Sequence, residues 1–151
     1  MYRQVKIQDM PQLIEMENYF FDVDSDLHDV KECCEKETGF VYEIDGNIQA
    51  YILYKECVKL SFFDSFARNI DCDYIVSLCV NREYQGKGIG KKLMKILPLQ
   101  GFVFLHVKKH NHTAIKLYEK MGFKSVKQEK GFFRDDDALI LLNENFSHYK
   151  N

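Results

Sequence analysis

Residues 81–95 read NREYQGKGIGKKLMK, and the glycines Gly86, Gly88 and Gly90 fall within five consecutive positions of this stretch. The apolar run YIVSLCV (74–80) before it is typical of a buried strand, and the residues after it have the apolar spacing of a helix. The N–H groups in the first turn of a helix have no partners within it, and they lie at the positive end of its dipole. Glycines let the backbone approach a bound anion closely. The stretch therefore predicts a phosphate-binding turn between a strand and a helix.

Two common phosphate-binding loops do not fit these residues. A P-loop reads GxxxxGK[ST], whereas Lys92 stands in place of the final Ser or Thr and Gln85 in place of the first glycine. The dinucleotide fingerprint GxGxxG also fails, because the three glycines are spaced two apart. The pattern that fits is Q-x-x-G-x-G, which on its own is equally compatible with an ordinary helix start. The stretch also carries lysines that are either phosphate partners or ordinary surface residues: Lys87, Lys91 and Lys92.

The remaining sequence predicts one mixed α/β domain over residues 1–151, with the element order β-α-α-β-β-β-α-β-α-β-β. Two helices follow the expected N-caps Asp9 and Ser25 or Asp26, and Gly39 is expected to end the second of them. Asp45-Gly46-Asn47 predicts a tight hairpin. Strands are expected at 2–7, 40–44, 48–58, 74–80, 102–107, 123–128 and 138–143, the other helices at 88–97 and 113–121, and a loop at 59–73.

Composition narrows the class of protein. The 151 residues are 46% hydrophobic, enough for one core, and the net charge of −2 argues against a nucleic-acid-binding protein. The five cysteines form no CxxC pair, so we expect reduced, mostly structural thiols. The sequence has no signal-peptide pattern and no run of 18 apolar residues. These features predict a cytoplasmic protein that does not associate with membranes.

A second stretch, FLHVKKHNHTAIKLYEKMGF (104–123), reads as a strand, a short turn, a helix and a closing Gly-Phe. Together the two stretches resemble the GNAT superfamily of acetyl-CoA-dependent N-acetyltransferases. In that family [RQ]-x-x-G-x-[GA] follows a central strand, and N-x-x-A-x-x-x-Y-x-x-x-G-F follows the next one. The resemblance covers 74–123 and implies the family's acyl-CoA N-acyltransferase fold, a mostly antiparallel α+β sheet with a splayed parallel pair and four helices. The second pattern matches at Asn111, Ala114, Tyr118, Gly122 and Phe123.

A finer resemblance is carried by YIVSLCV, LHV and GFFRDDDALIL. These segments are similar to the N-terminal acetyltransferases, the RimI-like enzymes and especially the San (NatE) type, which acts on peptides that start with Met. The RimI branch has a glutamate five residues before the asparagine, whereas this chain has His106, as San-type enzymes do. Tyr74 likewise matches the active-site tyrosine of that type. The resemblance implies acetyl transfer to the N-terminal α-amine of a protein or peptide.

The resemblance also implies where coenzyme A binds. Its pyrophosphate would lie on the backbone N–H groups of Gln85–Lys91, and its pantetheine arm would pair with Leu78–Val80. An N–H group near Val80 would donate to the thioester oxygen, and losing such a donor costs about 3–4 kcal/mol. The implied cofactor-binding residues are Leu78, Cys79, Val80, Gln85, Gly86, Lys87, Gly88, Ile89, Gly90, Lys91, Asn111 and Tyr118.

The implied catalytic residues are His106, Tyr74 and Tyr118. The acceptor amine must be uncharged to attack, and an α-amine, with a pKa of about 8, needs less help than a lysine, at about 10.4. His106 is expected to be the general base, directly or through a water, with Tyr74 holding that water or sharing the role. Tyr118 is expected to protonate the departing thiolate. Without the motif, His106 and Tyr74 are more readily interpreted as structural residues, and core packing is an alternative for Tyr118.

The substrate contacts implied by the resemblance come from two loops. Phe20, Phe21 and Val23 follow the first helix, and Phe132 and Phe133 precede the last turn. In San-type enzymes these loops form the peptide groove, although the second carries Tyr-Tyr where this chain has Phe-Phe. An ordinary core role for these aromatic residues stays open. We expect an acceptor with an apolar first residue such as Met.

Other interpretations remain at this point. The chain is alternatively a GNAT enzyme for a polyamine, an amino sugar or an amino acid, or a non-catalytic acyl-CoA-binding module. His110 and His112 flank Asn111, but no carboxylate has a suitable spacing, so no metal site is expected. The acidic run 135–137 is expected to be a solvated turn. We expect a monomer or homodimer.

Overall fold

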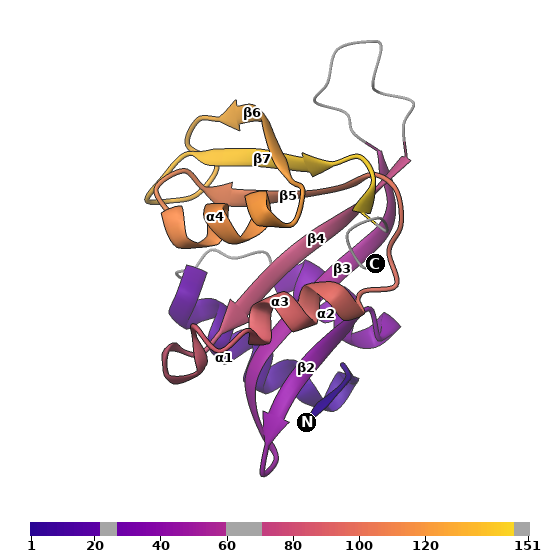
Figure 1. Cartoon of the computed structure of the whole chain (residues 1–151). Helices are drawn as coiled ribbons and strands as arrows, with labels where there is room; N and C mark the ends of the chain where they lie inside the picture. The colour runs from indigo at the N-terminus through magenta and orange to yellow at the C-terminus, as the bar shows by residue number, and fades with distance from the viewer. Residues whose placement is uncertain (22–26, 60–70, 147–151) are drawn as a thin grey trace. The chain divides into compact units, whose positions relative to one another are not determined.

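The computed structural model describes residues 1–21, 27–59 and 71–146 (Figure 1). Its strands form one sheet in the order β1-β2-β3-β4-β5-β7-β6, and only β4 and β5 are paired in parallel among the described pairs. The predicted fold class and element order are confirmed. The strands are β1 (Tyr2–Gln4), β2 (Gly39–Ile44), β3 (Asn47–Lys59), β4 (Asp71–Val80), β5 (Val103–Lys108), β6 (Lys124–Glu129) and β7 (Ala138–Asn143). The helices are α1 (Met10–Phe21), α2 (Leu27–Lys36), α3 (Ile89–Ile96) and α4 (His112–Lys120), with short 3-10 turns at Ile7–Asp9 and Arg82–Tyr84.

The chain forms two compact units, which are described separately. Unit 1 comprises Met1–Tyr54 and Val76–Leu97, and unit 2 comprises Lys55–Ile75 and Pro98–Asn151. Strand β4 contributes its first half to unit 2 and its second half to unit 1. A single domain over 1–151 stays a prediction.

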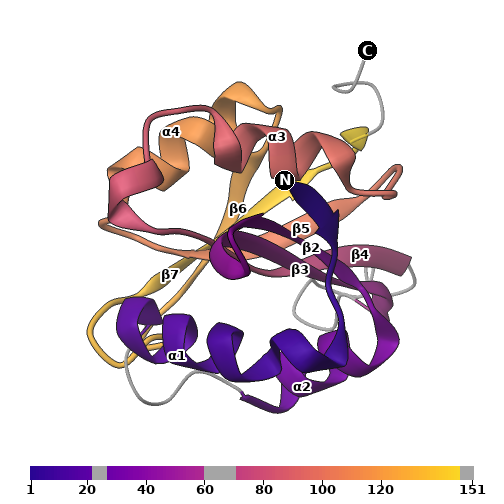
Figure 2. The same ribbon diagram turned by 90° about the horizontal axis from the view of Figure 1, so that it is seen from below.

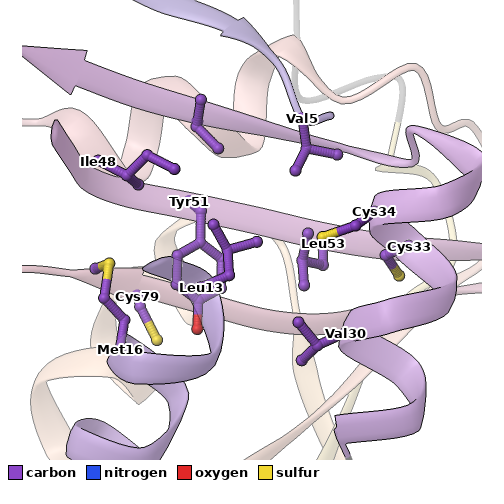
Figure 3. Packing of buried hydrophobic residues seen from close by; sticks show 11 residues of the cluster. Val5, Leu13, Met16, Val30, Cys33, Cys34, Ile48, Tyr51, Leu53 and Cys79 are labelled. Carbon is purple, nitrogen blue, oxygen red and sulfur yellow. The ribbon is translucent and has the colours of Figure 1, made fainter. Parts of the chain in front are cut away.

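Unit 1 has helices on both faces of its strands. Figure 2 shows α1 and α2 on one face of β2 and β3, and α3 on the opposite face. The core lies under α1 and α2, where Tyr51 and Cys79 project from the strands towards Leu13 and Met16 (Figure 3). The buried members of this core are Val5, Leu13, Met16, Val30, Cys33, Cys34, Val41, Ile48, Tyr51, Leu53 and Cys79.

The turn between β2 and β3 is the predicted tight hairpin. Asp45 and Gly46 have φ angles of 52° and 81°, so both adopt the left-handed conformation that a two-residue turn of this kind needs. Asp and Gly tolerate that conformation better than most residues do. The local sequence was therefore sufficient to predict this turn.

The end of α2 differs from the prediction. The helix ends at Lys36, and Glu37, rather than a glycine, adopts the left-handed conformation with a φ of 57°. Gly39 begins β2 instead, and a Cβ atom placed there would lie 2.6 Å from the carbonyl oxygen of Ile52. Gly39 is thus required by close strand packing and not by the helix end.

The structure also differs from the prediction that Asp9 is the N-cap of α1. Asp9 ends a 3-10 turn, and its carboxylate accepts hydrogen bonds from the Lys6 N–H group at 2.8 Å and from Arg3 at 2.8 Å. Asp9 therefore ties the turn to β1 and precedes α1. The alternative caps predicted for α2, at positions 25 and 26, lie outside the described residues.

Unit 2 contains the parallel pair and the closing hairpin. The parallel pairing covers only Asp73–Ile75 with Val103–Leu105, although β4 and β5 extend to Val80 and Lys108. This short pairing agrees with the predicted splayed pair. Strand β7 lies between β5 and β6 and is antiparallel to both, and its predicted bounds are confirmed. Residues 59 and 71–73, predicted as loop, belong to β3 and β4, and Asp73 is paired with Val103. Residues 60–70 lie outside the described part.

Neither a membrane-spanning helix nor a metal-binding cluster is found among the described residues. Within them, no helix combines the length and the apolar character needed to cross a membrane. No group of three or more His, Cys, Asp or Glu side chains in this part of the chain is arranged to hold a metal ion.

Candidate active site

The glycine-rich loop joins β4 to α3 in unit 1. Gly86 and Gly88 have φ angles of 76° and 80°, which an L side chain adopts only with strain. A Cβ atom placed on either glycine would meet no atom within 4 Å, so the space above this backbone is open. The N–H group of Lys92 donates to the Gly88 carbonyl at 3.0 Å. The N–H groups of Ile89–Lys91 lie in the first helical turn and therefore have no acceptor within the helix. This open, amide-lined turn fits a diphosphate.

The loop is tied to the end of β4. Gln85 donates from Nε2 to the Val80 carbonyl at 2.9 Å, and the Asn81 N–H group donates to the Gln49 carbonyl of β3 at 2.8 Å. Successive residues of a strand direct their backbone groups to opposite edges. The N–H and C=O groups of Val80 therefore face away from β3. The predicted thioester donor thus lies on the edge of β4 that β3 does not occupy.

The other residues of unit 1 predicted to contact the cofactor differ in how far their side chains are exposed. Leu78 is half-buried, whereas the side chains of Cys79 and Ile89 are buried, so the last two can offer only backbone groups. Burial also raises the pKa of the Cys79 thiol well above its usual value, which disfavours a thiolate at this position. Lys87 and Lys91 are exposed, and the Lys87 ammonium lies 5.2 Å from the centre of the Tyr84 ring.

Unit 2 brings together the predicted base and its tyrosine. The hydroxyl of Tyr74 on β4 lies 2.9 Å from Nδ1 of His106 on β5. On the other side of the ring, Nε2 lies 3.7 Å from Oε2 of Glu129, the last residue of β6. Burial lowers the pKa of His106 below its usual value, and the carboxylate of Glu129 opposes that shift. His106 is therefore held neutral at physiological pH, as a base must be.

The loop between β6 and β7 covers His106. The Phe132 ring stacks on the imidazole with centroids 4.0 Å apart and an interplanar angle of 3°, and Phe132 is itself 47% exposed. Phe133 meets Phe132 edge to face at 5.0 Å. Of the aromatic pair predicted for the second substrate loop, Phe132 thus lies directly on the candidate base, and Phe133 packs against Phe132.

The acidic run 135–137 follows a bend before β7, and the expected solvated turn is found only in part, because Asp135 is exposed whereas Asp136 and Asp137 are half-buried and hydrogen-bonded. Asp136 accepts hydrogen bonds from the backbone N–H of His110 and from that of Asp137, and it lies 2.9 Å from Nδ1 of His110. Asp137 accepts from Gly131 at 2.7 Å. Asp135 forms an ion pair with Lys108 at 3.0 Å. These contacts fix the loop that carries Phe132.

Helix α4 carries the two remaining predicted residues. Asn111 is its N-cap, because its Oδ1 accepts from the Ala114 N–H group at 3.2 Å. Tyr118 is 7% exposed and meets Phe123 edge to face at 5.9 Å. Both residues therefore have structural roles in unit 2 beside the functional ones that the resemblance implies.

The first substrate loop is only partly described. Phe20 and Phe21, at the end of α1, are half-buried and pack against the core of unit 1. Tyr19 beside them is 71% exposed. Val23 lies outside the described residues, so its predicted contact with a substrate stays a prediction.

A buried carboxylate in unit 1 was not predicted. Glu17 on α1 is 3% exposed, and its Oε1 accepts hydrogen bonds from the hydroxyls of Tyr51 at 2.7 Å and Ser77 at 2.6 Å. Burial raises the pKa of Glu17. Its position four residues after Leu13, on the apolar face of α1, was the available signal. Glu17 connects α1 to the half of β4 that carries the predicted thioester donor.

Glu17→Ala is expected to lower the free energy of unfolding by about 3 kcal/mol, because two hydroxyls lose their buried acceptor. Urea denaturation measures this change, and Glu15→Ala on the exposed face of α1 is the matched control, with little expected loss. A loss as small as that of the control would contradict a structural role for the carboxylate.

Glu17 also makes the stability of the folded state depend on pH. Because the pKa of Glu17 is higher in the folded state, its contribution to stability is fully present below about pH 4 and is lost as the pH rises through the folded-state value. Glu17→Gln should remove this fall in stability.

Known proteins resemble this chain in sequence and in fold. A family model described as the acetyltransferase (GNAT) family matches residues 7–123. An N-alpha-acetyltransferase of Sulfurisphaera tokodaii is 29% identical over 157 residues, covering 93% of this chain and 89% of that protein. A spermidine N(1)-acetyltransferase of Escherichia coli is 30% identical over 106 residues, covering 66% of this chain and 52% of that protein. Arabidopsis thaliana NAA60, solved in complex with acetyl-CoA, has a similar fold, with a TM-score of 0.74 at 20% identity over 95% of this chain and 98% of that one.

Proposed function

Because this chain belongs to the GNAT family of acetyltransferases, we propose that it transfers an acetyl group from acetyl-CoA to the N-terminal α-amine of a protein or peptide. The observation that carries the acceptor class is the Tyr74–His106 pair at 2.9 Å beneath the exposed Phe132. The relatives named N-alpha-acetyltransferase support the same acceptor class.

The cofactor fits the turn that begins α3. Its diphosphate needs several N–H donors and a backbone that it can approach closely. The first turn of α3 has the N–H groups, and Gly86 and Gly88 leave open space beside the backbone. Acetyl-CoA supplies an acetyl group activated as a thioester. The N–H group of Val80 is the proposed donor to the thioester oxygen, because it faces away from β3.

The proposed base suits an α-amine better than a more basic amine. The pKa of His106 is lowered by burial, so the neutral imidazole is a weak base. An α-amine with a pKa of about 8 is partly uncharged at neutral pH, whereas a lysine at about 10.4 is almost wholly charged. Deprotonating the α-amine is therefore within reach of His106. Tyr118 is the proposed acid that returns a proton to the departing thiolate.

The surroundings of His106 favour an apolar first residue over a polycation. Phe132 and Phe133 present aromatic surface there. The nearby carboxylates already have partners. Asp135 pairs with Lys108, and Asp136 accepts from the backbone N–H of His110. Glu129 faces Nε2 of His106. A polyamine would need unpaired carboxylates to hold its second ammonium group. We therefore propose Met, or a similar apolar residue, at the first position of the acceptor.

An acceptor panel tests the proposal. Initial rates of thiol release from acetyl-CoA are measured with three peptides, one starting with Met, one starting with Ser, and one that is N-terminally blocked but contains a lysine, and with spermidine. We expect the highest kcat/KM for the Met peptide, about tenfold or more above spermidine, and no transfer to the blocked peptide. Faster transfer to spermidine would instead favour a polyamine acetyltransferase, the function of the Escherichia coli relative.

A further inference from the structure

Glu129 lies beside the candidate base but belongs to a different strand. It ends β6, which pairs with β7, and β7 in turn pairs with β5, the strand of His106. The side chain of Glu129 is 27% exposed, and its Oε2 lies 3.7 Å from Nε2 of His106, whose side chain is 10% exposed. This arrangement is independent of the sequence motifs, none of which includes Glu129.

The two ring nitrogens of His106 face chemically different groups. Nδ1 faces the Tyr74 hydroxyl, which can donate or accept a hydrogen bond, whereas Nε2 faces a carboxylate, which can only accept. At 3.7 Å the carboxylate forms no hydrogen bond with the buried Nε2 atom, and it acts on Nε2 through its charge. A neutral imidazole carries one proton, and the negative charge favours the form with that proton on Nε2. The lone pair of Nδ1 is then directed at Tyr74. The parallel Phe132 ring at 4.0 Å holds the imidazole in this plane.

We infer that Glu129 is a positioning residue of the transfer reaction, which keeps the Nε2 proton on His106 so that Nδ1 receives a proton through Tyr74. This inference rests on the proposed function. The ammonium form of the acceptor gives one proton to the Tyr74 oxygen as the Tyr74 proton moves to Nδ1, which leaves an uncharged amine and an imidazolium. The amine nitrogen then has a free lone pair for attack, Tyr74 is unchanged, and the resulting imidazolium faces the side chain of Glu129. The extra proton later leaves to solvent.

The other charged groups near His106 do not duplicate this role. Lys127 lies level with His106 across β7, and Lys108 lies two residues further along β5. Both carry positive charge, which disfavours an imidazolium, and Lys108 is paired with Asp135. Tyr74 is uncharged. Among the described residues whose contacts with the ring are known, Glu129 alone supplies the negative charge that stabilises the protonated base.

Glu129→Gln tests this role, with Glu119→Gln on the exposed face of α4 as the control for loss of one negative charge. We expect Glu129→Gln to lower kcat about tenfold, with the KM values of both substrates nearly unchanged. The acid limb of kcat/KM against pH should move to lower pH by up to about one unit, because the imidazolium loses its partner. Glu119→Gln should change neither quantity.

A second measurement does not depend on turnover. Imidazole nitrogen-15 chemical shifts report which ring nitrogen of His106 carries the proton above its titration, and we expect Nε2 in the wild type. A proton on Nδ1, or a pH profile of Glu129→Gln that matches the wild type while His106→Ala abolishes transfer, would overturn the inference and leave the proposed function standing. A wild type that acetylates no amine in the panel would overturn both.

Discussion

Gly88→Leu is expected to weaken acetyl-CoA binding by about 100-fold or more, which corresponds to about 2.7 kcal/mol. Gly88 is the N-cap of α3 and adopts a φ of 80°. A leucine there is strained, and its side chain fills the open space above the amides that the diphosphate would occupy. Isothermal titration calorimetry with acetyl-CoA measures the dissociation constant directly.

The hairpin glycine Gly46 provides a matched control. Its φ is 81°, and a Cβ atom placed there also meets nothing within 4 Å. Gly46→Leu and Gly88→Leu should therefore lose similar stability, about 1–2 kcal/mol, from backbone strain alone. Only Gly88→Leu should lose the cofactor. Equal binding by both variants would show that the turn before α3 does not hold the diphosphate.

His106→Ala is expected to lower kcat by about 10²–10⁴-fold, with the affinity for acetyl-CoA unchanged, because general-base catalysis supplies a factor of that size. Rapid-mixing measurements of acetyl transfer give kcat, and a binding titration gives the affinity. His28→Ala, at an exposed position on α2, is the control for loss of a histidine.

The wild-type pH profile provides a second test of the same role. Because burial lowers the pKa of His106, its neutral form persists below the usual histidine value of about 6.5. The acid limb of kcat should therefore lie below that value and should be absent from the residual activity of His106→Ala. An unchanged kcat in that variant would remove His106 from the base role.

Local patterns were enough to predict the part of the chain that carries the glycine-rich turn. Strand β4, the loop and α3 follow one another in sequence, and glycine spacing and apolar periodicity are local properties. The same holds for the β2–β3 hairpin and for the bounds of β7. The resemblance to the GNAT superfamily drawn from residues 74–123 is confirmed by the family match over 7–123.

The side chains that surround the candidate site depend on contacts distant in sequence. Glu17 meets Tyr51 and Ser77, which are 34 and 60 residues away. A lone glutamate on a helix is usually solvated, so only the register between α1 and the strands shows its burial. Glu129 likewise meets His106 only because β7 aligns β6 with β5.

The contacts of the acidic run 135–137 likewise depend on residues distant in sequence. Three successive aspartates are typical of an exposed turn, and the sequence gives no sign that His110, 26 residues away from Asp136, lies beside them. The closing hairpin brings the two segments together. Strand register therefore decides which side chains surround His106, whereas the local sequence decides where the strands are.

The central claim is that the backbone amides at the start of α3 hold the diphosphate of acetyl-CoA. Titrating nitrogen-15-labelled protein with coenzyme A tests it most directly, through the amide signals of individual residues. The signals of Gly86, Gly88, Ile89 and Gly90 should shift most and saturate together with binding. Saturable binding that leaves these four signals in place and shifts amides elsewhere would contradict the claim.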